Sequence, residues 1–302
     1  MHMISLIKTQ DWQGTAAILI ACLLWGTTGT AASFTHQVSP LATGAFAMGV
    51  GGLLLVLSSW NYLKRDWGLL KQQQSLVLFG GLAVAVYPMS FYSSMDYAGV
   101  AVGSVMSLAS APFWSALLEG LISKTKVSRR WIFSFAIGIL GIALLALSEG
   151  HSAQASSVAQ NYNLGVMLGL LTGLTYAFYS WSTKRLIQHG LHSKAAMSSQ
   201  FAVATVLLLP SLVITGDHLF SSTTNTVIAV YMATIPMFLG YLAFGYGLRF
   251  IAASKATLLT LSEPVIASLL AVVVVGERIN TQGAIGIVLI MVCLFAQAKG
   301  KE

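Results

Sequence analysis

The sequence predicts an all-α membrane protein in which ten transmembrane helices form two inverted five-helix repeats around a central cavity. Three observations lead to this prediction: the composition, the number of long apolar stretches and the placement of the charged residues. Of the 302 residues, 56% are hydrophobic and 8% are charged, and the mean hydropathy is +0.77. Soluble domains average about 25% charged residues, so lipid suits this surface better than water. The same composition disfavours intrinsic disorder, secreted disulfide scaffolds and nucleic-acid-binding domains.

Ten apolar stretches follow one another along the chain with short connections. Each is long enough to cross a hydrocarbon core of about 30 Å as a helix, although the last is marginal in length. The stretches lie at residues 14–36, 40–60, 74–95, 99–122, 131–148, 163–183, 195–215, 225–248, 253–275 and 282–297. Aromatic residues typical of the membrane–water interface stand near several of their ends: Trp12, Trp60, Trp67, Trp131 and Tyr162. The first stretch is too long for a cleaved signal peptide, so we expect it in the mature protein.

The charged residues predict the orientation of these helices. If the N-terminus is cytoplasmic, fifteen of the sixteen basic residues fall on the inner side, and only Arg278 falls outside. The inner set is Lys8, Lys64, Arg65, Lys71, Lys124, Lys126, Arg129, Arg130, Lys184, Arg185, Lys194, Arg249, Lys255, Lys299 and Lys301. The outer connections carry the acidic residues Asp96, Glu149, Asp217 and Glu277. This positive-inside pattern predicts ten spans with both termini in the cytoplasm, and it explains the net charge of +7 without a nucleic-acid partner.

The longest polar connection, Glu149 to Asn163, divides the chain into two halves of five stretches, residues 1–150 and 151–302. Because five is odd, similar halves must be inserted in opposite orientations. A weak internal similarity joins residues 92–101 and 111–113 to residues 246–255 and 263–265, and it places Pro112 and Pro264 in the fourth stretch of each half. Inverted repeats with a site at the membrane midplane are a common plan for transporters.

Four motifs in order then resemble the drug/metabolite transporter superfamily, and in particular its EamA family. They are Leu24-Trp25-Gly26-Thr27, the run Tyr176 to Arg185, Ser262-Glu263-Pro264-Val265, and the run Gly276-Glu277-Arg278 with Gln282 and Gly286. The resemblance covers nearly the whole chain. It implies a ten-helix exporter of small metabolites, often amino acids, in the inner membrane of a bacterium.

Two departures from the family pattern limit the analogy. The first half has Ile122-Ser123-Lys124 where the family has Gly-Glu, with Glu119 one turn earlier. The first span has no glutamate, whereas the small four-helix multidrug transporters of this superfamily carry their proton-coupling carboxylate there. The mechanism of those transporters therefore cannot be transferred position by position.

Polar and aromatic side chains form stripes along several of the predicted helices. Such a stripe deep in a span should face a cavity or another helix, because a hydroxyl in hydrocarbon lacks partners. We predict that the stripes line a pocket for a flat or apolar-bodied solute, which stacks on aromatic rings or is held through an ammonium group. The candidate substrate-binding residues are Trp25, Thr28, Tyr87, Phe91, Ser107, Ser110, Trp114, Tyr176, Tyr179, Tyr241 and Phe244. The alternative for each aromatic residue is ordinary packing between helices.

Other residues in these helices have expected structural roles. Pro88, Pro112, Pro236 and Pro264 fall inside the same spans, where they free carbonyl groups and allow bending. Gly165, Gly169 and Gly173 repeat every four residues and predict a helix-packing face with no ligand role.

Two carboxylates inside the predicted spans are candidates for proton coupling. Glu263 lies near the middle of the ninth stretch, and Glu119 lies closer to the inner end of the fourth. A carboxylate at bilayer depth is costly unless it is paired, solvated or protonated, and so indicates function by default. The alternatives are a structural hydrogen bond of Glu263 to a serine or to backbone freed by Pro264, and contact of Glu119 with Lys124 or Arg185 at the interface.

No other class of function has comparable support. Cys22 and Cys293 lie in apolar stretches, and His189 and His192 lie beside basic residues without a carboxylate cluster, so neither a metal nor a cofactor is expected. Nucleotide-binding and hydrolase motifs are absent. The expected partners are a small-molecule substrate, membrane lipid and protons, and the working unit is expected to be a monomer. A multidrug exporter of lipophilic or quaternary cations is the second hypothesis, and an intramembrane enzyme or a scaffold is less favoured.

Overall fold

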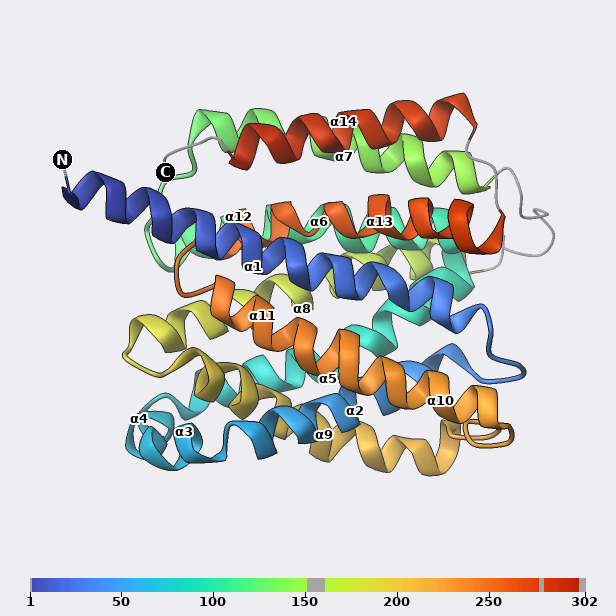
Figure 1. Ribbon diagram of the computed structural model, residues 1–302, viewed down its shortest axis with the longest axis horizontal. Helices are drawn as coiled ribbons and strands as arrows, with labels where there is room; N and C mark the ends of the chain where they lie inside the picture. The colour runs from blue at the N-terminus through green and yellow to red at the C-terminus, as the bar shows by residue number, and fades with distance from the viewer. Residues whose placement is uncertain (1, 151–160, 277–279, 299–302) are drawn as a thin grey trace.

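The computed structural model describes residues 2–150, 161–276 and 280–298 (Figure 1). All regular elements in these residues are helical. The first half contains α1 (His2–Ala32), α2 (Pro40–Ser58), α3 (Trp60–Arg65), α4 (Trp67–Gln72), α5 (Gln74–Ala98), α6 (Val100–Leu121) and α7 (Arg129–Gly150). The second half contains α8 (Tyr162–Gln188), α9 (Ser193–Thr215), α10 (Thr223–Met232), the π-helical segment η2 (Ala233–Leu239), α11 (Gly240–Gly247), α12 (Ala253–Leu259), α13 (Ser262–Leu270), the π-helical segment η3 (Ala271–Val275) and α14 (Thr281–Ala298).

Eight helical segments of the described residues are long and apolar enough to cross a membrane. They are Gln10–Ala32, Pro40–Ser58, Gln74–Ala98, Arg129–Ser148, Tyr162–Gln188, Ser193–Thr215, Thr223–Gly247 and Ala253–Val274. These segments match eight of the ten predicted stretches, and they make the chain a multi-pass membrane protein. The fourth and tenth stretches correspond to α6 and to α14, whose apolar part Thr281–Gln297 is shorter. Large apolar side chains such as Val213 and Ile214 are 90% and 85% exposed, as contact with lipid requires.

Two of these spans are interrupted in the second half. The span Thr223–Gly247 passes through η2, which contains Pro236; a proline has no N–H to donate, so the regular hydrogen-bond ladder gives way there. The span Ala253–Val274 breaks at a turn formed by residues 260–261, between α12 and α13. Pro264 then stands in the first turn of α13, where a backbone N–H would have no partner inside the helix. Pro112, its counterpart in the first half, lies within the continuous helix α6.

The helices of the two halves are interleaved (Figure 1). At one edge of the bundle α7 packs on α14, and at the other edge α2 packs on α9. Between these edges α5 and α6 pack on α8, while α11 and α13 pack on α1. These contacts between a first-half helix and a second-half helix therefore recur with the halves exchanged.

The predicted glycine face of α8 is confirmed. A Cβ atom at Gly165 would stand 2.5 Å from the backbone nitrogen of Ala98, and one at Gly169 would stand 2.6 Å from the Cβ of Met106. At Gly173 it would collide with the side chain of Ser110. The three glycines thus allow α8 to approach α5 and α6 closely.

Several connections lie together at one end of the bundle, on the left in Figure 1, where α1 also begins. They are residues 59–73, 122–128, 189–192 and 248–252, and we call this end the basic face. These connections and the adjoining helix ends carry Lys64, Arg65, Lys71, Lys124, Lys126, Arg129, Arg130, Lys184, Arg185, Lys194 and Arg249. Glu277, Arg278, Lys299 and Lys301, whose sides of the membrane were also predicted, fall outside the described residues.

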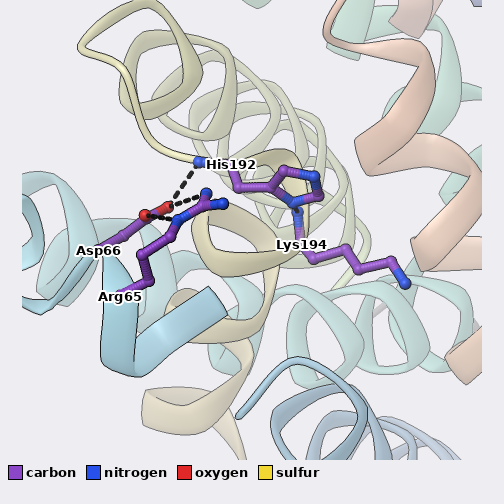
Figure 2. A network of polar contacts seen from close by, with 4 residues as sticks. All are labelled: Arg65, Asp66, His192 and Lys194. Carbon is purple, nitrogen blue, oxygen red and sulfur yellow. Dashed lines mark hydrogen bonds and ion pairs between the residues drawn. The ribbon is translucent and has the colours of Figure 1, made fainter. Parts of the chain in front are cut away.

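A polar contact ties the two halves at the basic face (Figure 2). Asp66, in the connection between α2 and α5, accepts a hydrogen bond from the backbone amide of His192 at 2.7 Å, and Arg65 pairs with the same carboxylate at 2.8 Å. The ring of His192 stacks on Tyr62, and its Nδ1 atom accepts from the backbone amide of Lys194 at 3.2 Å, which caps α9. We call the Asp66–His192 contact the basic-face clasp.

Candidate functional site

Two adjoining cavities lie between the halves and together form what we call the central cavity. Their volumes are about 70 and 360 Å³. They share six lining residues: Trp25, Thr28, Phe91, Tyr92, Met232 and Glu263. Because α1 and α5 of the first half contribute to the wall together with α10 and α13 of the second, any movement between the halves would change its shape.

Most of the predicted aromatic stripe converges on this cavity. The lining includes eight of the residues predicted from sequence to bind substrate or to couple protons: Trp25, Thr28, Tyr87, Phe91, Tyr176, Tyr179, Tyr241 and Glu263. They come from five separate elements, α1, α5, α8, α11 and α13. The structure therefore brings together residues that lie far apart in the sequence.

The aromatic rings form a connected layer at one end of the cavity. Trp25 lies 4.9 Å from Tyr241 between ring centroids, and Tyr176 lies 5.3 Å from Tyr179. The hydroxyls of Tyr179 and Tyr241 are hydrogen-bonded at 3.1 Å. These contacts come from both halves, so the layer joins the halves as well as closing the cavity.

Trp25 is fixed by the irregular backbone of the facing span. Its indole Nε1 donates to the carbonyl of Pro236 at 3.0 Å, within the π-helical segment η2. Gly240 is necessary for this contact, because a Cβ atom there would stand 2.6 Å from Nε1 of Trp25. The wide turn of η2 and the absence of a side chain at Gly240 together make room for the indole of Trp25.

Two polar groups of the cavity wall have no hydrogen-bond or ion-pair partner among the residues that the structure describes. The carboxylate of Glu263 forms no hydrogen bond or ion pair with any residue that the structure describes, and it lines both parts of the cavity. The hydroxyl of Tyr176 is buried and also has no hydrogen-bond partner among the described residues. Glu263 stands in the first turn of α13, directly after the break in the ninth span, where the positive end of the helix dipole favours a carboxylate. The carboxylate of Glu263 is thus an acceptor available to a solute.

Four predicted substrate-binding residues do not line the central cavity. Phe244 is fully buried behind Trp25, with ring centroids 5.3 Å apart. Ser107 and Ser110 lie on α6 where it meets Gly173 of α8, so these serines serve close helix packing. Trp114 packs edge-on against Phe113, with ring centroids 5.3 Å apart.

Glu119 lies in a different place from Glu263. Its Oε1 atom accepts a hydrogen bond from the backbone amide of Ala253 at 2.7 Å, at the start of α12. It lines a separate cavity of about 200 Å³ at the basic face. The two predicted proton-coupling carboxylates therefore do not share a site.

The central cavity also contains residues that the sequence pattern did not predict. Tyr92 lines both of its parts, and Met48, Met232 and Met237 also contribute. Tyr92 directly follows Phe91, so it fell outside a stripe defined by spacings of three and four. The methionines carry no signal that separates a cavity wall from ordinary packing, since flexible thioethers are used in both.

Comparison with known proteins gives a consistent picture. The model of the "EamA-like transporter family" matches residues 12–147 and again residues 163–296. An "uncharacterized transporter" of Bacillus subtilis, YwfM, is 28% identical over 92% of this chain and 90% of its own length. A "probable amino-acid metabolite efflux pump" of Salmonella typhimurium is 24% identical over 93% of both chains. A solved crystal structure with 18% identity superposes with a TM-score of 0.77, covering 94% of this chain and 95% of that one, which shows a shared fold.

Proposed function

Because this chain belongs to the EamA-like transporter family, we propose that it exports amino acids or related small metabolites by alternating access, driven by the proton gradient. Family membership makes the chain a membrane transport protein and not an enzyme. The substrate, the direction, the coupling ion and the inner-membrane location belong to the proposal. The basic face is the cytoplasmic side in this proposal, because basic connections remain on that side.

The observation that carries the proposal is the unpartnered carboxylate of Glu263 in the central cavity. A carboxylate within a membrane span is costly to ionise without a partner, so it either takes up a proton or binds a cation. A site that alternates between these two states exchanges a proton for a substrate ammonium. The surrounding aromatic rings add favourable contacts to an ammonium group or to an apolar side chain.

Two observations support a transporter of two inverted repeats. The family model matches the chain twice, once in each half. The packing contacts of α1 with α11 and α13 repeat those of α8 with α5 and α6. We infer that α6 and α14 complete a set of ten spans, which gives each half five and thus opposite orientations.

The shape of the central cavity supports an outward-facing state. Its larger part is lined by Ala32 at the end of α1, Met95 near the end of α5 and Ala146 near the end of α7. These helix ends lie away from the basic face. The layer of Tyr176, Tyr179 and Tyr241 closes the cavity on the side of the basic face. Opening this layer is the movement that admits a solute from the cytoplasm.

A second candidate function is export of lipophilic or quaternary cations. A single carboxylate surrounded by aromatic rings also fits such cations. Unlike amino acids, these cations carry no carboxylate for which the protein would have to provide a binding partner. The two functions are distinguished by a transport assay on the protein reconstituted into liposomes, in which we expect it to act as a monomer. With and without a pH gradient, a panel of labelled amino acids and organic cations is tested for saturable transport. Transport of amino acids supports the main proposal, and transport of cations alone supports the second.

A further inference from the structure

The α11–α12 connection, residues 248–252, is fastened at both of its ends to neighbouring helices at the basic face. At its start, the Nζ atom of Lys184 on α8 donates to the carbonyl of Leu248 at 2.9 Å. Directly after its end, Oε1 of Glu119 on α6 accepts a hydrogen bond from the backbone amide of Ala253 at 2.7 Å. Both bonds satisfy groups that a helix leaves free at its ends, and in both cases the partner comes from a different helix. The bonds therefore break when α6 and α8 part from this connection.

The two bonds lie at a seam where the fourth and ninth spans meet. On the basic face, α12 packs on α6 and on α8. Exchange of the halves replaces α12 by the start of α6, α6 by α13, and α8 by α1. At the other end of the bundle, however, the start of α6 is separated from α1 and α13 by the larger part of the central cavity, which Ser104, Ala32 and Ala267 line. The seam is thus closed on the basic face and open on the opposite face.

The residues at the two ends of the bundle differ in the same sense. The internal similarity between the halves pairs Ala253 with Gly99, and open space surrounds the position of a Cβ atom on Gly99. The same similarity, continued past the two in-span prolines, places Ala271 at the position of Glu119. Because alanine has no side-chain acceptor, this position cannot form an equivalent of the Glu119 bond. Membrane orientation explains basic residues on the inner side, but not a carboxylate that holds a backbone amide across a seam.

A small cavity lies directly beside the closed seam. It has a volume of about 200 Å³ and is lined by Glu119, Lys184 and Ser254 together with residues of α7 and α14. Its walls on α6, α8, α12 and α14 are the counterparts of the walls that α13, α1, α6 and α7 give to the larger part of the central cavity. It therefore lies where an inner opening forms if the two halves exchange conformations.

We propose that Glu119 and Lys184 are the gate residues on the basic face. Their bonds hold the start of the ninth span on α6 and α8 while the central cavity is open at the opposite end. Release of these bonds lets α12 move away, and the small cavity then extends toward the layer of tyrosines that closes the central cavity. The gate rests on the proposed function, because it presupposes alternating access. In this role Glu119 acts through its acceptor oxygen and not through uptake of a proton.

Labelling of a single cysteine by a hydrophilic thiol reagent tests the gate in the purified full-length protein. The two native cysteines, Cys22 and Cys293, are buried and are replaced by alanine. The inner reporter is Thr257→Cys, because Thr257 is 0% exposed and lies one turn along α12 from Ala253. The outer reporter is Ser104→Cys, which lies in the wall of the larger part of the central cavity and measures opening at the other end.

Removal of either bond should expose the inner reporter. Glu119→Ala and Lys184→Met each remove a contact that is made only in the closed state, so Thr257→Cys should react about fivefold faster in each. Ser104→Cys should react no faster. Glu119→Gln keeps an acceptor for the backbone amide of Ala253, so the inner reporter should react more slowly in it than in Glu119→Ala.

A lysine of the same face provides the matched control. Lys71→Met removes a lysine on α4, away from the seam, and should leave both reporters unchanged. The gate would be overturned by unchanged labelling of Thr257→Cys in both Glu119→Ala and Lys184→Met. It would also be overturned by an equal rise at the two reporters, by the same rise in Lys71→Met, or by equal labelling of Glu119→Gln and Glu119→Ala.

The labelling needs neither a solute nor a pH gradient, so its outcome is separate from that of the transport assay. If Thr257→Cys reacts faster in the gate variants while Glu263→Gln retains full proton-driven transport, the coupling proposal fails and the gate stands. If labelling is unchanged in the gate variants while Glu263→Gln abolishes proton-driven transport, the gate is wrong and the proposed function stands.

Discussion

The carboxylate of Asp66 accepts a hydrogen bond from the backbone amide of His192 at 2.7 Å, and this bond links the two halves (Figure 2). A second contact of the same kind occurs at the opposite face, where Oδ1 of Asn225 accepts the backbone amide of His36 at 3.1 Å. In both contacts the donor lies between the first and second long helices of one half. The acceptor lies at or before the start of the third long helix of the other half. This reciprocity is what two inverted repeats would produce.

The basic-face clasp should contribute measurably to stability. Asp66 is 5% exposed, and removing an acceptor that serves a buried charge-assisted hydrogen bond costs about 1–3 kcal/mol. Asp66→Ala should therefore lower the apparent Tm in detergent. Arg65→Gln is the control, because the Arg65 side chain is 59% exposed and a surface ion pair contributes about 0–1 kcal/mol. A larger loss of Tm in Arg65→Gln than in Asp66→Ala would contradict this account of the clasp.

The same region makes the stability depend on pH. Burial lowers the pKa of His192, and the positive charges of Arg249 and Arg65 lower it further. Burial alone would raise the pKa of Asp66, but the hydrogen bonds from Arg65 and from the His192 amide hold it below its usual value. Both groups thus have a lower pKa in the folded state than in the unfolded chain. Their contributions are complete above the unfolded pKa values and disappear as the pH falls through the folded values.

The expected result is a decrease of apparent Tm as the pH falls below about 6.5, where the histidine of the unfolded chain takes up protons. A further decrease should follow below about 4, from Asp66. His192→Asn keeps a side chain that can cap α9 but does not titrate, so it should flatten the first decrease. Thermal unfolding of the unmodified protein and of His192→Asn between about pH 3 and pH 8 measures both decreases, and an unchanged slope in His192→Asn would exclude His192 as the cause of the first.

Removal of the Tyr176 hydroxyl should change the KM for transport without changing the apparent Tm. Because this hydroxyl has no partner among the described residues, Tyr176→Phe should not lower the apparent Tm. If the hydroxyl serves the solute, the same variant should raise the KM for transport several-fold. Tyr246→Phe, at a half-exposed position of α11 outside the central cavity, is the matched control. A loss of Tm without a change in KM would instead assign the hydroxyl to the fold.

Gly169 tests the close packing of α8. A Cβ atom there would stand 2.6 Å from Met106 and 2.9 Å from the hydroxyl of Ser94, so Gly169→Ala should destabilise the protein by about 1–3 kcal/mol. Gly68→Ala is the control, since nothing lies within 4 Å of its added Cβ. Alanine in that helix should be neutral or slightly stabilising, by about 0.5–1 kcal/mol. Equal values of Tm for the two variants would show that the glycine face is not tightly packed.

The sequence predicted the apolar helices and most of the aromatic part of the cavity wall because both depend on local pattern. Spacings of three and four residues placed Tyr176 and Tyr179 on one face of α8, and that face does line the cavity. The same reasoning failed to separate Ser107 and Ser110 from the cavity residues, because a serine stripe that packs on Gly173 has the same period as one that binds a solute. Which face of α6 meets α8 depends on tertiary packing.

Backbone irregularity was also only partly predictable. Pro264 and Pro112 occupy corresponding positions, yet the helix around Pro112 is continuous and the one before Pro264 is broken. Neighbouring helices decide whether the freed carbonyl groups can be satisfied without a break. The two short helices α3 and α4 were not expected, since Asp66 interrupts a segment too short and too polar to show a helical period.

Proton-driven transport by Glu263→Gln in liposomes tests the central claim most directly. The variant keeps the size of the side chain but cannot exchange a proton. Asp96→Asn, which neutralises an exposed carboxylate at the end of α5, is the control. The account predicts that Glu263→Gln loses substrate accumulation driven by a pH gradient while Asp96→Asn retains it. Full gradient-driven accumulation by Glu263→Gln would contradict the claim that this carboxylate couples transport to protons.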